Sequence, residues 1–170
     1  MFINTLPIIF AYTQLFTLIE AIVFLAVIFI LVYFFAPDAN KKWRHKPTGS
    51  IYQFLHAAWL GKAPLWGAFW PFFVLVNAAL YYIDYRIMTV TYTIASWKTV
   101  HGMLLLPIVW WILSVWRCSE HTQHKLFSSA ARTLTVCLVF EYFLRFIIST
   151  YYPNTFFDCR LLLINHRDCV

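Results

Sequence analysis

The chain has 170 residues, of which 62% are hydrophobic and 12% are charged, and its formal net charge is +6 at pH 7. Soluble domains carry roughly 25% charged residues, so this chain has too little polar surface to be a water-soluble globule. Its basic residues lie beside apolar stretches and not along one face of a folded unit, which excludes nucleic acid as a partner. The length suits one membrane domain over residues 1–170.

Four apolar stretches have the roughly 20 residues that a helix needs to cross a bilayer. They cover residues 15–36, 64–83, 96–116 and 131–152. The first stretch has no basic segment before it and no small-residue cleavage site, so we interpret it as a retained helix and not as a signal peptide. The sequence therefore predicts an all-α integral membrane protein with four transmembrane helices.

The basic residues indicate how these helices are oriented. Eight of the thirteen fall in two alternate gaps, namely the 37–63 loop and the 117–130 loop together with Arg132 just after it. Short loops rich in Lys and Arg stay on the cytoplasmic side. We therefore expect both termini outside, with an external tail over residues 153–170.

A short amphipathic helix is expected over residues 50–60. Ser50 and Gln53 have the spacing of a capping box, in which each side chain satisfies a free backbone N–H group. Apolar residues then recur with helical spacing until Gly61, and Pro64 suits the first turn of the next helix. The segment predicts a helix in the cytoplasmic membrane interface. It is either an elbow that anchors the second span, which we favour, or a docking surface for a partner.

Two of the four cysteines, Cys159 and Cys169, lie in the tail that the charge pattern places outside. Oxidising compartments preserve disulfide bonds, so we expect these two to pair, which would stabilise the tail by roughly 3 kcal/mol on a loop-entropy estimate. Thiol redox catalysis favours a Cys-x-x-Cys motif, and the sequence has none.

Among the polar residues inside the predicted spans, Glu20, Asn77, His101, Glu141 and Arg145 form a candidate group in the outer half of the bilayer, with Lys98 entering the third span nearby. Polar groups at this depth are costly and have a functional or structural reason. Glu141 and Arg145 are four residues apart with the acid first, the better order for an ion pair on a helix. We expect an intramembrane polar network that fixes helix packing. A proton or ion pathway and contact with a charged residue of a neighbouring subunit stay open as alternatives.

The histidines are the candidate metal or haem ligands of this sequence. His121 and His124, with Cys118 and Glu120 nearby, could hold a metal, but a second ligand pair is missing. A membrane haem needs two axial ligands, and only His101 lies within a span. Phosphate-binding and hydrolase motifs are also absent from the sequence. We expect no catalytic residue, no metal and no cofactor.

The segment from Trp59 to Trp70 reads Trp-Leu-Gly-Lys-Ala-Pro-Leu-Trp-Gly-Ala-Phe-Trp, with Lys62 and Trp66 between its ends. It resembles a motif in small, mostly uncharacterised bacterial inner-membrane proteins, where a Trp-x-Gly segment precedes a Leu-Trp-x-x-Phe-Trp helix start. Its physical content is an interface anchor, with tryptophans at headgroup level and Lys62 reaching lipid phosphates. The resemblance covers a dozen residues, and it implies a bacterial inner membrane but no reaction.

These features together predict a non-catalytic structural or accessory subunit of a larger inner-membrane complex of the secretion, conjugation or respiratory type. Its partners are then the lipid bilayer and other integral membrane subunits. One alternative is a small oligomeric transporter or channel that uses the outer-half polar residues. A second is a membrane redox or cofactor-binding protein.

Overall fold

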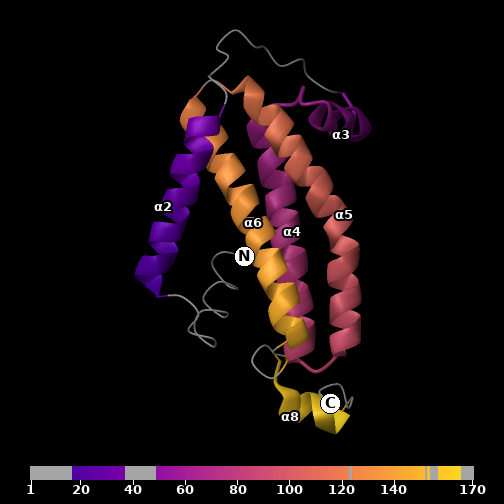
Figure 1. Cartoon of the computed structure of the whole chain (residues 1–170). Coiled ribbons are helices and arrows are strands. Elements are labelled where there is room, and N and C mark those ends of the chain that lie inside the picture. The colour runs from indigo at the N-terminus through magenta and orange to yellow at the C-terminus, as the bar shows by residue number, and fades with distance from the viewer. Residues whose placement is uncertain (1–16, 37–48, 123, 152, 154–156, 166–170) are drawn as a thin grey trace.

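The computed structural model describes residues 17–36, 49–122, 124–151, 153 and 157–165, and all regular structure in this part is helical (Figure 1). This confirms the all-α fold. The helices in chain order are α2 (Leu18–Phe35), α3 (Ile51–Trp59), α4 (Leu65–Met88), α5 (Ile94–Cys118), the 3-10 helix η1 (Ser119–His121), α6 (Lys125–Tyr151) and α8 (Cys159–Asn165).

Three helices, α4, α5 and α6, are long and apolar enough to cross a membrane. They run up and down in turn as one bundle, with α5 packed against both α4 and α6 (Figure 1). Each is longer than the apolar stretch that predicted it. The helix α6 begins at Lys125 and not near residue 131, because the polar residues of its first turns continue the helix although they do not resemble a membrane core.

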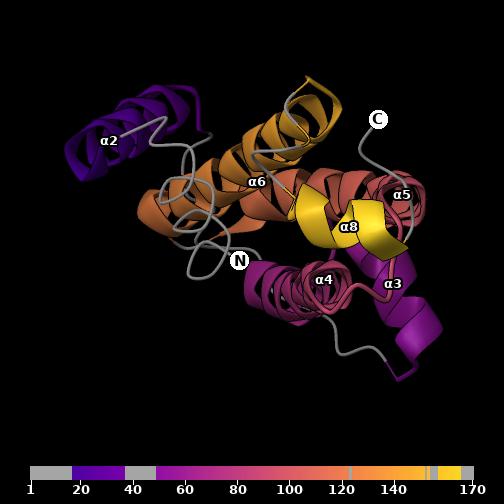
Figure 2. The ribbon, with the colours of Figure 1, turned by 90° about the horizontal axis from the view of Figure 1, so that it is seen from below.

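The fourth apolar helix, α2, is shorter and packs against α6, with the rings of Phe24 and Phe140 at 5.1 Å. Seen along the bundle it stands apart from α4 and α5 (Figure 2). Its apolar side chains point in all directions, so most of them are exposed. A fourth crossing and the orientation of the bundle stay predictions.

The predicted short helix exists as α3 and runs across the end of α5 (Figure 1). The predicted capping box is wrong. The Ser50 side chain makes no cap hydrogen bond, and Gln53 Oε1 accepts from the N–H of Gly49 at 3.3 Å, so the side chain of Gln53 caps one residue earlier than expected. After α3 the chain turns at Gly61, where φ is 73°.

The bundle has two apolar cores. The larger one joins α3, α4, α5 and α6 and includes the buried rings of Phe69 and Trp111. The smaller one lies at the opposite end, where the α4–α5 turn meets the C-terminal segment. There Phe157 packs edge-on against Trp97, with ring centroids 5.4 Å apart, so the C-terminal segment covers this end of the bundle.

Candidate functional site

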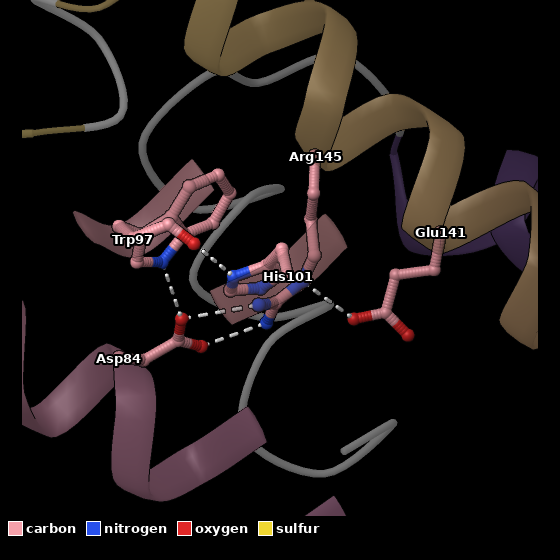
Figure 3. A network of polar contacts seen from close by, with 5 residues as sticks. All are labelled: Asp84, Trp97, His101, Glu141 and Arg145. Atoms are coloured by element: carbon pink, nitrogen blue, oxygen red, sulfur yellow. Dashed lines mark hydrogen bonds and ion pairs between the residues drawn. The ribbon is translucent and has the colours of Figure 1, made fainter. Parts of the chain in front are cut away.

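The candidate site is a buried ion-pair cluster centred on Arg145 (Figure 3). It lies near the end of the bundle that Phe157 covers, because Trp97 contacts both Asp84 and Phe157. Arg145 extends from α6 toward α4 and forms a bidentate ion pair with Asp84. Its Nη1 donates to Oδ1 at 3.1 Å and its Nη2 donates to Oδ2 at 2.8 Å. Its Nε donates to Glu141 Oε1, one turn earlier on α6, at 3.2 Å. The planar guanidinium matches a carboxylate in this two-point geometry. One cation thus holds two carboxylates on two helices.

The helix α5 supplies the aromatic side of the cluster. The indole Nε1 of Trp97 donates to Asp84 Oδ1 at 3.3 Å. The hydroxyl of Tyr142, on α6, donates to the backbone oxygen of His101. Each contact joins two helices, so the cluster ties α4, α5 and α6 together.

His101 lies against Trp97, with ring centroids 3.7 Å apart. Its Nδ1 is 3.0 Å from the backbone oxygen of Trp97. A carbonyl oxygen only accepts, so Nδ1 carries the hydrogen, and in the neutral ring Nε2 keeps its lone pair. This Nε2 is buried and has no hydrogen-bond partner among the described residues. The imidazole therefore offers one open acceptor beside the ion pairs.

Burial decides what these contacts are worth. The side chains of Arg145 and Glu141 are 1% and 3% exposed, whereas that of Asp84 is 14% exposed. Removing one partner from such a pair leaves a buried charge uncompensated and costs about 3–5 kcal/mol. Exposed ion pairs are worth about 1 kcal/mol or less. The arrangement can fix how three helices pack, and its carboxylates and imidazole are groups that can carry protons.

The structure brings His101, Glu141 and Arg145 together and leaves out the other two expected members of the network. Glu20 is exposed at the start of α2, where it forms a capping box: its Oε2 accepts from Thr17 N at 2.7 Å, and Thr17 Oγ1 accepts from Glu20 N at 3.3 Å. Asn77 donates through Nδ2 to Phe73 O of its own helix at 2.6 Å. The side chains of Glu20 and Asn77 therefore bind backbone groups of their own helices and do not join the cluster.

Sequence reasoning missed Asp84, because the apolar run of the second span ends at Ile83 and the next residue was assigned to a loop. The helix continues to Met88, so Asp84 still belongs to α4. The sequence does contain a signal for it. Leu80, Ile83 and Ile87 recur at helical spacing and extend the apolar pattern past residue 83, and Asp84 shares their face of the helix.

The opposite end of the bundle carries the residues expected as an interface anchor. Trp66 and Trp70 stack on α4 with ring centroids 6.0 Å apart and are both half exposed. Trp59 lies under the guanidinium of Arg117, which is 4.5 Å above its ring. Lys62 is exposed on the segment between α3 and α4.

Two arginines at this end bind the last carbonyl groups of helices. Arg117 Nη1 donates to Trp59 O, at the end of α3, at 2.7 Å. Arg132 Nη2 donates to Trp116 O near the end of α5 at 3.2 Å, and its Nε donates to Ser119 Oγ at 2.6 Å. Such carbonyls lack partners inside their own helix and form the negative end of its dipole. Arg117 thus fastens α3 to α5, and Arg132 fastens α5 to α6.

The considered metal ligands do not converge. Cys118 is buried with its Sγ 3.5 Å from Ala58 O, whereas His124 is exposed and meets Phe127 edge-on. Within the described residues, no group of three His, Cys, Asp or Glu side chains is placed to hold a metal ion.

The tail disulfide stays a prediction. Cys159 begins α8, and its expected partner Cys169 lies outside the described residues. The thiols of Cys118 and Cys137 are free and buried within the bundle.

No protein-family model, curated protein or solved structure matches this chain. The resemblance of the 59–70 segment therefore stays a prediction, and the functional argument rests on the geometry of the chain.

Proposed function

We propose that the protein is a non-catalytic structural or accessory subunit of a larger bacterial inner-membrane complex. The observation that carries this proposal is that the charged cluster joins three helices of the bundle. Arg145 joins α6 to Asp84 of α4, and Trp97 of α5 donates to the same carboxylate. Each of these two contacts joins two helices, so we assign the cluster to helix packing, the role that interhelical hydrogen bonds have in membrane bundles.

The placement of α2 supports a role within an assembly. This helix packs against α6, and its other apolar faces are exposed, including Ile22 and Phe34. A helix that packs mainly against one of the described helices can take up a further membrane subunit beside it without disturbing the bundle. In this proposal α2 crosses the membrane as the fourth span.

Charge supports the proposed orientation. The described cations at the α3 end are Lys62, Arg117, Lys125 and Arg132, and the only described acid near them in the chain is Glu120. This excess of basic over acidic residues favours the cytoplasmic side for this end. The α4–α5 turn, α8 and both termini then lie outside.

Co-purification tests the proposal. The tagged wild-type chain and its Ile22→Trp variant are each extracted from the native membrane in a mild detergent. The variant adds a bulky side chain to the exposed face of α2 and does not alter the bundle. We expect stable membrane partners with the wild type and fewer with the variant at equal abundance. Recovery of the chain without any stoichiometric membrane partner would overturn the subunit role.

A small transporter or channel is the second candidate, and the open Nε2 of His101 beside the carboxylates favours it. Glu141→Gln separates the two candidates, because the amide keeps the shape of the side chain and removes its charge. A subunit loses abundance or assembly, whereas a transporter loses proton or ion flux in proteoliposomes at normal abundance. Leu138→Met, a volume-conserving change one turn away on α6, is the matched control.

A further inference from the structure

The surface where α3 meets α5 has the form of a binding site for a lipid headgroup. Arg117 is exposed there, yet its guanidinium is held in place by the ring of Trp59 at 4.5 Å and by Trp59 O at 2.7 Å. A guanidinium has five N–H donors, and only one of them has a partner among the described residues. The remaining donors are oriented in advance and available.

A second cation lies next to this one. Gly61 touches Arg117 so closely that a Cβ on the glycine would lie 2.9 Å from Arg117 Cβ, and Lys62 follows directly. The Lys62 side chain is exposed and makes no hydrogen bond or ion pair with any described residue. Lys62 therefore adds a second exposed cation on the segment that packs against Arg117.

The helix α3 exposes apolar side chains near these cations. Ile51 and Tyr52 on α3 and Leu60 at its end are 81%, 77% and 46% exposed, beside the exposed polar side chains of Gln53 and His56. A helix that exposes apolar side chains beside polar and cationic groups can lie in a membrane interface, with the apolar side chains among acyl chains and the cations at the level of the phosphates.

We infer that Lys62 and Arg117 bind the phosphate of one anionic phospholipid whose acyl chains lie along the exposed face of α3. The inference requires a membrane location for the bundle, but it requires neither a partner subunit nor a given orientation. Charge complementarity selects an anionic headgroup, because a zwitterionic one brings a cation into the same place. The guanidinium fork suits two phosphate oxygens and the ammonium group suits a third.

The test is native mass spectrometry of the purified full-length chain in a mild detergent, titrated with phosphatidylglycerol or phosphatidylcholine. We expect the wild type to retain phosphatidylglycerol preferentially. Each cation at an anionic surface is worth about fivefold in affinity, so Lys62→Gln should weaken phosphatidylglycerol binding about fivefold and leave phosphatidylcholine binding unchanged. Lys62 has no internal contact to lose, so this variant should fold normally.

Two matched variants separate a site from general surface charge. Lys98→Gln removes a cation at the opposite end of the bundle, and Lys41→Gln removes one from the basic segment outside the described residues. Neither should change binding of the first phosphatidylglycerol molecule by more than about twofold, well under one cation's fivefold share. Equal weakening by Lys41→Gln and Lys62→Gln would overturn the inference.

Two further measurements complete the test: lipid binding by the Arg117→Lys variant, and competition of inorganic phosphate with the lipid. The lysine keeps the charge but loses the fork and the contact with Trp59 O, so we expect weaker phosphatidylglycerol binding than in the wild type. Inorganic phosphate at the same concentration should not displace the lipid. Displacement by inorganic phosphate would assign the site to a free anion and overturn the lipid assignment.

Discussion

The two ends of the bundle use arginine in opposite ways. At the end covered by Phe157, Arg145 is buried and two carboxylates bind its guanidinium. At the α3 end, Arg117 and Arg132 bind backbone carbonyls and lie over tryptophan rings. Carbonyls and aromatic faces stabilise a cation without cancelling its charge. At the first end the charge of Arg145 is compensated by Asp84 and Glu141, and we call these three residues the clamp. The second end keeps a positive charge that can face lipid headgroups.

The largest effect should come from breaking the clamp. Arg145→Met leaves the buried Glu141 and the partly buried Asp84 without their cation, and it should lower the free energy of unfolding by about 3–5 kcal/mol. Thermal unfolding of the purified protein and its abundance in the membrane measure the loss.

Adding Asp84→Asn and Glu141→Gln to Arg145→Met should restore most of the lost stability, because the triple variant has no charge left to desolvate. A triple variant as unstable as the single one would show that the contacts themselves, and not charge compensation, hold α4 to α6. Lys98→Gln is the control for loss of one cation.

Breaking the open end should cost less. Gly61 has a φ of 73°, and the backbone of Arg117 lies 3.2 Å from where a Cβ would be. Gly61→Ala should therefore destabilise by about 1–3 kcal/mol through backbone strain and displacement of Arg117. Gly102→Ala is a matched control, because a Cβ at that helical position meets no atom within 4 Å. If the two variants unfold alike, close contact at Gly61 is not what positions α3 on α5.

A subtler change tests how α5 joins the clamp. Trp97→Phe keeps an aromatic ring against Phe157 but removes the hydrogen bond from Nε1 to Asp84 Oδ1. A hydrogen bond to a charged group contributes about 1.5–3 kcal/mol, and Arg145 still compensates the carboxylate, so we expect a loss near the lower figure. Denaturant unfolding measures it. A loss as large as that of Arg145→Met would mean that packing of the indole, and not its N–H, is what matters.

The contrast between the ends also explains what could be predicted from sequence. Apolar length found the three long helices, because the bilayer imposes that length directly. The Glu141–Arg145 pair was visible because both residues lie on one helix. Asp84 was not, since it is 61 residues from Arg145 and only the rotation of α4 within the bundle brings them together. Tertiary packing sets that rotation, just as the close approach of Gly61 to Arg117 depends on how α3 lies on α5.

The smallest effect compares two helix starts at opposite ends of the molecule. Thr17 caps α2 through its side chain, whereas Ser50 makes no cap hydrogen bond at α3. Thr17→Ala should cost about 1 kcal/mol, and Ser50→Ala should change the free energy of unfolding by less than about 0.5 kcal/mol. Amide hydrogen exchange in the first turns of α2 and α3 resolves such local differences. Faster exchange in α3 after Ser50→Ala would mean that Ser50 does cap that helix in the membrane, and that the Gly49–Gln53 contact does not replace it.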